Sequence, residues 1–167
     1  KNFLTGSFVI EFWLCPSLAE SGEQFFSWRS SRNVGAIPLY QDIRASFFNN
    51  HVEWVFNNIF GSGNKVESEV IITSSDSIIP QKWARHQISY DDETGLIEYR
   101  IDGKIQAVRY VTSTQRESGE VFNARLGVPA DIEICTKYSG LIDEICISRT
   151  SHAAINQDFY ARKGGRF

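Results

Sequence analysis

Hydrophobic and polar residues alternate in short runs along most of the 167-residue chain. Within residues 8–15, Phe12, Leu14 and two further apolar residues occupy every second position. The positions between them include the charged residue Glu11. A period of two places successive side chains on opposite faces of a β-strand. We therefore expect a strand here that buries one face and ends at Pro16, which has no N–H to donate to a sheet.

Similar runs recur every 8 to 12 residues or so, which is typical of antiparallel β-proteins. The expected strands are 24–30, 43–48, 52–58, 66–73, 85–91, 96–102, 105–111, 124–128, 132–135 and 141–148. Asn49-Asn50-His51 and Gly103-Lys104 predict tight turns between neighbouring strands, because Asn and Gly tolerate positive φ. Gly61-Ser62-Gly63-Asn64 is expected to be a flexible loop, and Ala153–Arg162 is the one segment with a helical pattern.

Many short strands without alternating helices predict an all-β fold, a two-sheet antiparallel β-sandwich or jelly roll with a short C-terminal helix. No composition shift or repeat divides the chain, so we expect one domain over residues 1–167. The expected core includes Phe12, Leu14, Ile88, Tyr90, Ile101 and Ile145.

Composition narrows the function classes. A net charge of −3 and a pI near 5.6 provide no basic face for phosphates, so no nucleic-acid partner is expected. No apolar run reaches the roughly 18 to 20 residues that cross a bilayer, so the chain is not expected to be membrane-embedded. The sequence has no Met, and we expect it to have been cut from a longer protein.

Three segments, in order, carry a resemblance to a known family: FVIEFWLCP at 8–16, KWARHQISYDDETGLIEYRIDGK at 82–104 and YSGLIDEICIS at 138–148. Together they resemble laminin G-like jelly-roll domains of the concanavalin A-like lectin/glucanase superfamily. The family commonly places a His directly after the Trp of the second segment, whereas here Ala84 follows Trp83 and the imidazole is His86. The resemblance implies a non-catalytic binding module of a secreted, periplasmic or cell-surface protein.

Catalysis is disfavoured by the arrangement of carboxylates. Glucanases of the superfamily carry paired Asp or Glu along one strand, on either side of the sugar. The nearest pairs here are Asp131 with Glu133 and Asp143 with Glu144, and adjacent strand residues point to opposite faces. No G-x-S-x-G nucleophile motif is present either. A glycoside hydrolase is therefore the third hypothesis, and we expect no enzymatic activity.

The resemblance also implies a structural calcium ion. In relatives, the Asp of the G-x-I-D-E segment, here Asp143, helps to hold calcium together with backbone carbonyl groups. Calcium takes six to eight oxygen ligands, which one carboxylate, carbonyls and waters can supply. The alternative for Asp143 is an ordinary hydrogen-bonded side chain at a strand edge.

Carbohydrate is the favoured ligand, because sugar binding combines aromatic rings with planar groups that bond hydroxyls. The candidate ligand-binding residues are Trp28, Arg29, Arg44, Trp54, Arg109 and Tyr110. For each aromatic residue the alternative is a place in the core, because sandwiches bury such rings between their sheets.

The runner-up is a protein–protein adhesion or structural module inside a larger chain, with an extracellular protein as the partner. The three cysteines, Cys15, Cys135 and Cys146, are too few for a disulfide scaffold, and three reduced thiols are one reading. The topology of the family implies the other reading, in which Cys15 and Cys146 face each other on neighbouring strands.

Overall fold

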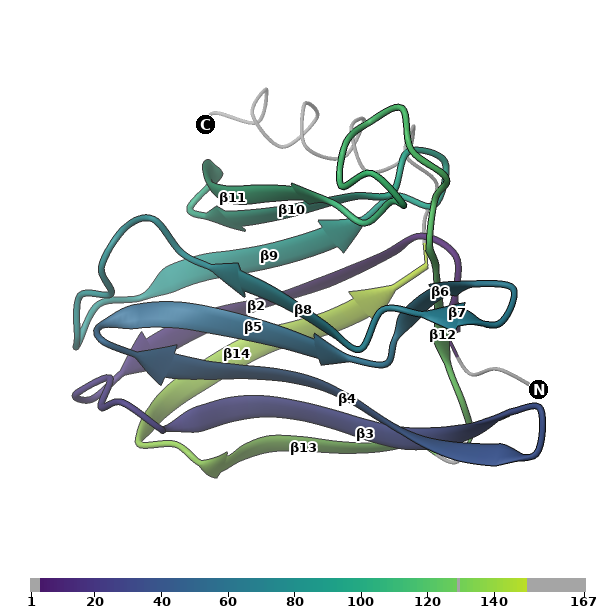
Figure 1. Ribbon diagram of the computed structural model, residues 1–167. Coiled ribbons are helices and arrows are strands. Elements are labelled where there is room, and N and C mark those ends of the chain that lie inside the picture. Colours follow the sequence, from purple (N-terminus) through teal and green to yellow (C-terminus); the bar gives the residue numbers. More distant parts are fainter. Residues whose placement is uncertain (1–3, 129, 150–167) are drawn as a thin grey trace.

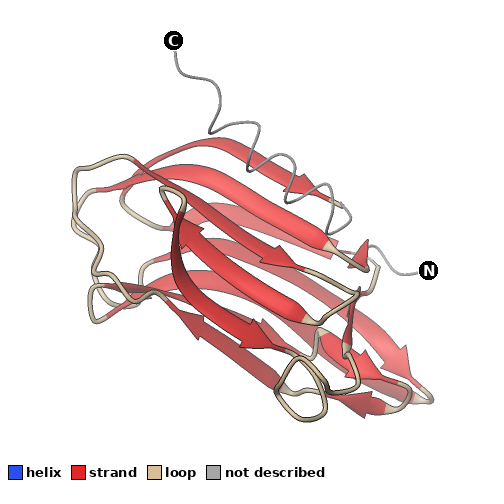
Figure 2. Ribbon diagram, turned by 90° about the horizontal axis from the view of Figure 1, so that it is seen from above, coloured by secondary structure: helices blue, strands red, loops and turns tan. Residues whose placement is uncertain are grey.

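The computed structural model describes residues 4–128 and 130–149, which form strands and connecting turns with no helix (Figure 1, Figure 2). The all-β prediction is confirmed, and the helix expected at Ala153–Arg162 lies outside the described residues. Within the described ranges, no helix has the length and apolar character needed to span a membrane.

Two five-stranded antiparallel sheets form the stacked layers of the sandwich (Figure 1, Figure 2). We call one the β2 sheet, with strand order β11-β10-β9-β2-β14. Its strands are β2 (Phe8–Pro16), β9 (Ala84–Tyr90), β10 (Leu96–Ile101), β11 (Lys104–Tyr110) and β14 (Gly140–Ser148). The other is the β4 sheet, with order β13-β3-β4-β5-β8. Its strands are β3 (Gln24–Val34), β4 (Ile37–Phe48), β5 (His51–Asn57), β8 (Glu69–Thr73) and β13 (Ala130–Lys137).

A small third sheet, ordered β1-β12-β6-β7, lies beside the two layers. Its strands are β1 (Leu4–Thr5), β6 (Phe60–Ser62), β7 (Lys65–Val66) and β12 (Asn123–Leu126). The segment expected to be a flexible loop at Gly61–Asn64 is therefore a tight hairpin, and that prediction is wrong. A Cβ on Gly61 would lie 2.4 Å from the carbonyl oxygen of Lys65, so glycine is needed for the strands to approach.

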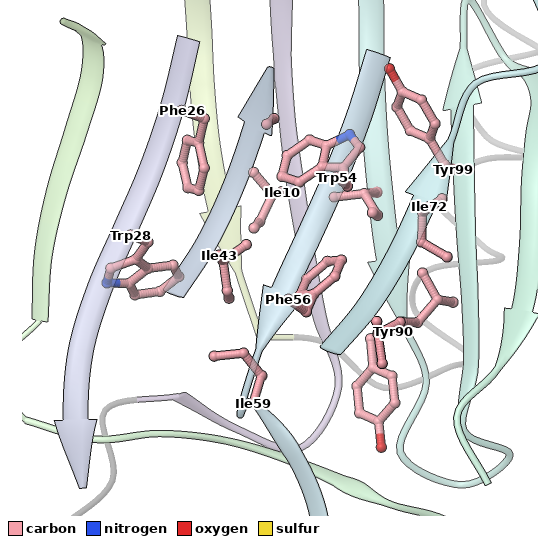
Figure 3. Packing of buried hydrophobic residues seen from close by; sticks show 14 of the residues in the cluster. Ile10, Phe26, Trp28, Ile43, Trp54, Phe56, Ile59, Ile72, Tyr90 and Tyr99 are labelled. Carbon is pink, nitrogen blue, oxygen red and sulfur yellow. The ribbon is translucent and has the colours of Figure 1, made fainter. Parts of the chain in front are cut away.

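Aromatic side chains from both sheets fill the core between them (Figure 3). The Trp54 ring of the β4 sheet lies 6.1 Å from the Phe12 ring of the β2 sheet and 6.2 Å from the Tyr99 ring, measured between ring centroids. Aromatic side chains bury large areas, and tilted or edge contacts between rings add to that stabilisation. The many Phe and Trp side chains of the sequence thus form much of the interface between the two layers.

The core predictions hold where the strands are regular and fail at one bulge. Phe12, Leu14, Ile88 and Tyr90 are buried, and Ile101 is partly buried against the same cluster. Ile145 is 38% exposed, so its assignment to the core is wrong. The pairing of β14 with β2 shifts register between Asp143 and Cys146, and a bulge of this kind breaks the alternation of faces.

The hairpin of β3 and β4 is longer than the sequence pattern indicated. Its strands pair from Gln24↔Ser46 out to Val34↔Ile37, and Gly35 turns the chain with φ of 63°. The next turn is confirmed as predicted, since Asn49 and Asn50 have φ of 48° and 64°. The extra length of the hairpin carries the candidate site.

Candidate functional site

The outer face of the β4 sheet carries a row of polar side chains across all five strands. On β4, Ile43 and Ala45 are buried, so alternation directs Asp42 and Arg44 outward. Backbone pairing then aligns one residue of each strand in a single row. The row is Asp131, Arg29, Asp42, Asn57 and Glu69.

A groove of about 670 Å³ lies over the middle of this row. We call it the Tyr40 groove. Its lining residues are Arg29, Ser30, Ser31, Tyr40, Gln41, Asp42, Asn57, Asn58 and Asp131. Tyr40 is 83% exposed, the largest exposure among the large hydrophobic residues that the structure describes. The groove therefore combines one open aromatic ring with a guanidinium group, carboxylates and amides.

Two ion pairs lie at or beside the groove. Arg44 donates from Nη1 to Asp42 Oδ2 over 2.9 Å, and Arg29 pairs with Glu133 of β13. Asp42 Oδ1 is buried and has no hydrogen-bond partner in the described part of the chain. This oxygen faces away from solvent, and the accessible part of the carboxylate, which makes the Asp42 side chain 21% exposed, is the part that a ligand could reach.

Hydrogen bonds beneath the groove fix its floor. The buried Gln41 side chain donates from Nε2 to the carbonyl oxygens of Asn58 (2.8 Å) and Arg125 (2.5 Å). Its Oε1 accepts from the backbone N–H of Gly127 over 2.8 Å. Asn58, at φ of 56°, donates from Nδ2 to the carbonyl oxygen of Tyr40 over 2.7 Å. These bonds hold β4, the end of β5 and β12 together, so the groove is preformed.

Two of the predicted ligand-binding residues lie in the core instead. Trp28 pairs with Ile43 and Trp54 with Ala45, and all four side chains are buried. Figure 3 shows Trp28, Ile43 and Trp54 in the core between the sheets. Trp28 is 1% exposed and Trp54 0%. Buried rings present no surface to a sugar, so the assignment of these two residues to a binding face is corrected to the core.

The four remaining predicted residues fall into two groups. Arg29 and Arg44 lie on the outer face of the β4 sheet, at or beside the Tyr40 groove. Arg109 and Tyr110 lie on β11, at the far edge of the other sheet. The Arg109 guanidinium donates to the carbonyl oxygen of Ile71 on β8 over 3.3 Å, which links the two layers at that edge. The structure therefore brings together only the first pair.

Asp143 lies on the outer face of β14, opposite Trp13, next to the bulge. It is exposed, and its Oδ1 accepts a hydrogen bond from the backbone N–H of Glu144 over 2.8 Å. No group of three or more His, Cys, Asp or Glu that suits a metal ion is found among residues 4–128 and 130–149. The described side chains thus offer calcium one carboxylate here, and binding through Asp143 stays a prediction.

The cysteines are all free thiols. Cys15 lies opposite Leu141 and Cys146 opposite Glu11 in the pairing of β2 with β14. Four residues separate these positions along β2, a distance of roughly 13 Å, and a disulfide needs Cα atoms less than about 7 Å apart. The implied pairing of Cys15 with Cys146 is therefore wrong for this structure.

The residues at the centre of the groove, Tyr40, Asp42 and Asn57, were not among those predicted from the sequence. The strand expected at 43–48 begins after Tyr40 and Asp42, so both residues fell outside it. The signal in the sequence was weak, because the residue between Tyr40 and Asp42 is the polar but buried Gln41, which hides the period of two upstream of Ile43.

Comparisons with known proteins agree on the architecture. No protein-family model matches the chain, and no curated protein sequence matches it significantly. Among solved structures, the CBM40 domain of the Ruminococcus gnavus IT-sialidase bound to α2,3-sialyllactose matches with a TM-score of 0.57 at 11% identity. That match covers 95% of this chain and 82% of the other.

Two further structures match similarly. Domain 4 of AbnA, an extracellular arabinanase from Geobacillus stearothermophilus in complex with arabinotriose, has a TM-score of 0.52 at 13% identity, covering 93% of this chain and 66% of the other. Domains LG4-5 of the mouse laminin α1 chain have a TM-score of 0.54 at 11% identity, covering 90% of this chain and 37% of the other.

The chain spans a minor part of some matching structures, including 37% of the botulinum neurotoxin serotype G binding domain, which it matches with a TM-score of 0.50 at 13% identity. At identities this low, the likeness concerns the fold. The order of strands in two stacked antiparallel sheets and these matches together show that the chain has the concanavalin A-like lectin/glucanase fold.

Proposed function

We propose that this protein is a non-catalytic carbohydrate-binding module and that the Tyr40 groove holds the sugar. The observation that carries the proposal is the position of an open aromatic ring beside a preformed row of hydrogen-bonding side chains. The apolar face of a sugar ring packs on an aromatic ring, while its hydroxyls need donors and acceptors at fixed positions. Tyr40 supplies the first, and Arg29, Asp42 and Asn57 supply the second.

The length of the row suits a short oligosaccharide. Adjacent strands lie about 4.8 Å apart, so the three intervals from Asp131 to Asn57 span roughly 14 Å across the sheet. A flat row of this kind is open at both ends, since it crosses the sheet rather than entering it. We therefore infer binding along a chain of sugars rather than capture of a single terminal ring.

The charge balance favours a neutral sugar. Both guanidinium groups near the groove are paired with carboxylates, Arg29 with Glu133 and Arg44 with Asp42. The lining adds Asp131, whose negative charge opposes an anionic ligand at close range. The Asp42 side chain is 21% exposed, and its carboxylate would accept a hydrogen bond from a sugar hydroxyl; bonds to a charged acceptor are stronger than neutral ones.

Structures with the same fold support the class of function. The solved structures of the CBM40 domain and of AbnA domain 4 each contain a bound carbohydrate. A fold alone does not fix a function, and the support for this chain comes from the groove. A binding module of this kind fits the predicted secreted, periplasmic or cell-surface location.

Binding to an array of neutral and sialylated glycans tests the proposal. We expect neutral oligosaccharides to bind and Tyr40→Ala to weaken them by about 30-fold, since a central aromatic contact is worth about 2 kcal/mol. Phe48→Ala is the matched control, because Phe48 is an exposed aromatic residue on the same face of the same strand, about 26 Å away.

Either of two results would contradict the proposal. One is that the folded protein binds no glycan on the array, and the other is that Tyr40→Ala and Phe48→Ala lose the same amount of affinity. The protein-adhesion alternative would then take its place, with Ile37 and Val128 as further exposed apolar residues. Asp42 and Asp131 lie on either side of Arg29, and Asp131 shares this face with Glu133, so carboxylates that resemble a hydrolase pair are present here. Assay of the bound oligosaccharides for new reducing ends tests that third hypothesis, and we expect none.

A further inference from the structure

A second cavity, of about 310 Å³, lies beneath the segment that joins β8 to β9. We call it the His86 pocket. Its apolar lining comes from Leu14, Pro16, Ile78, Ile79, Ala84 and Ile101. It shares no residue with the Tyr40 groove. Its volume falls at the low end of the range of about 300 to 1,000 Å³ that is usual for small-molecule sites.

One polar group in the pocket has an unusual environment. The His86 ring is 1% exposed and stacks on Phe12, with ring centroids 5.4 Å apart and planes inclined by 13°. Its Nδ1 lies 2.6 Å from the hydroxyl oxygen of Tyr99. Burial lowers the pKa of His86 to about 3, so the imidazole is neutral near pH 7.

The contact with Tyr99 fixes the tautomer of that neutral ring. Tyr99 is fully buried, and burial raises its pKa well above the usual value, so its hydroxyl keeps the proton. An O–H buried without an acceptor costs about 1 to 3 kcal/mol, and His86 Nδ1 is the acceptor within reach. Tyr99 therefore donates to Nδ1, which leaves the hydrogen of the neutral imidazole on Nε2.

The Nε2–H group is then a donor that lacks a partner. In the described residues, His86 makes its one hydrogen bond through Nδ1 and its ring contacts with Phe12 and Tyr99. The side chain lines the pocket, and Nε2 is its one polar atom not used by the protein. A nearly buried donor without a protein partner, beside the apolar side chains of the pocket, is a site for an acceptor atom of a ligand.

The segment over the pocket is held in place rather than loose. Asp76 accepts from Lys104 Nζ over 2.8 Å, and its backbone N–H donates to Gln106 Oε1 over 2.8 Å. Further along, Ile78 and Gln81 donate backbone bonds of 2.6 and 2.7 Å to carbonyl oxygens on neighbouring elements. A fixed rim keeps the cavity open, which lowers the entropy cost of binding.

The charges of the pocket do not select an ion. Its lining contains the carboxylates of Asp76 and Asp102 and the ammonium groups of Lys82 and Lys104, two of each sign. The ligand is therefore expected to be uncharged, with most of its surface apolar.

We propose that the His86 pocket binds a small uncharged, largely apolar molecule through a carbonyl or hydroxyl oxygen that accepts a hydrogen bond from His86 Nε2–H. The site is separate from the sugar groove and does not depend on the proposed carbohydrate function. Its ligand would be enclosed by Leu14, Ile78 and Ile101 with its oxygen at the imidazole.

Two probes of nearly the same shape test the hydrogen bond. Acetophenone carries a carbonyl oxygen, and α-methylstyrene replaces it with a methylene group. NMR titration of the wild-type protein, observing the His86 ring nitrogens and the methyls of Ile78 and Ile101, is expected to show both signals moving with acetophenone. α-Methylstyrene should bind about 2- to 10-fold more weakly, the value of one neutral hydrogen bond.

The same spectra and one variant can overturn the proposal. An Nδ1–H tautomer in the free protein, equal affinity for the two probes, or no shift of the pocket methyls at the solubility limit would each contradict it. Ala84→Leu fills the pocket from β9 and should abolish acetophenone binding while the His86 resonances keep their positions. Unchanged binding in that variant places the probe elsewhere and also contradicts the proposal.

Discussion

The inner and outer faces of the β4 sheet use the same strands for opposite purposes. On the inner face, Trp28 and Trp54 are almost without solvent contact, and Trp54 packs on the rings of Phe12 and Tyr99 from the other layer. On the outer face, Arg29 follows Trp28 in sequence and Asp42 precedes the buried Ile43, and both line an open groove. A residue's neighbour in sequence is thus a poor guide to its role in a strand, because each step changes the environment from core to solvent.

The largest expected effect is on the inner face. Trp54→Ala removes a fully buried indole at the centre of the aromatic cluster and should lower the free energy of unfolding by about 3 to 5 kcal/mol, measured by urea denaturation. Phe48→Ala, on the outer face of β4, should change it by no more than about 0.5 kcal/mol. If the first variant does not fold, Trp54→Phe is expected to show a smaller loss in the same direction. Equal stability of all three variants would contradict the division between the faces.

Acid should weaken the inner layer through His86. Its folded pKa of about 3 lies below the value of 6.5 for an exposed imidazole, so the unfolded chain binds the proton first as pH falls. The contribution of the neutral, buried His86 side chain to the free energy of unfolding is therefore present above pH 6.5 and is lost progressively toward pH 3. At pH 5 the loss amounts to about 2 kcal/mol.

Urea denaturation at pH 7 and pH 5 measures this difference. His86→Phe should flatten the change between the two pH values, because Phe cannot titrate. His51→Gln, which alters a less buried imidazole, is the control that should keep it. A wild-type protein equally stable at both pH values would show that His86 is protonated in the folded state.

On the outer face, the expected effect is on binding. Asp42→Asn weakens the acceptor within the Tyr40 groove and should reduce affinity for the best glycan by about tenfold, the value of a charge-assisted bond. The partly exposed ion pair with Arg44 contributes at most about 1 kcal/mol, so stability should change little. Glu69→Gln makes the same chemical change at the end of the same row, outside the groove, and should bind normally. Calorimetric titration separates the two, and equal affinities would remove Asp42 from the site.

The smallest effect is expected at Asp143, on the outer face of the other sheet. If this carboxylate helps to bind calcium, the ion at three times its dissociation constant adds about 0.8 kcal/mol, or a rise of roughly 2 to 3 °C in Tm. Asp143→Asn should abolish the rise, and chelation should reverse it in the wild-type protein. A Tm that changes with neither calcium nor chelator would contradict the prediction.

The sequence pattern was sufficient for the architecture because most strands bury one face. The runs around Phe12 and Ile88 alternate without interruption, and both were assigned correctly. It failed at Ile145, because a bulge is a local change of register that leaves no mark in the periodicity. It also missed the Gly61 hairpin, where two-residue and three-residue strands are too short to show a period.

The site was less predictable than the fold. Arg29 and Arg44 were identified from their residue type, but Trp28 and Trp54 were placed with them although they face the core. Asn57 joins the groove through the pairing of β5 with β4, at a separation of 15 residues from Asp42. Which of two adjacent residues faces outward depends on the register of every strand pair, and register is a property of the assembled sheet.

The free thiols of Cys15, Cys135 and Cys146 have a practical consequence. Since no covalent crosslink joins the strands, the reduction potential of the surroundings does not enter the folding equilibrium. The sandwich should unfold at the same urea concentration with or without a reductant such as dithiothreitol. A module of this kind keeps its shape in a reducing compartment and an oxidising one alike, and its production does not depend on an oxidising folding pathway.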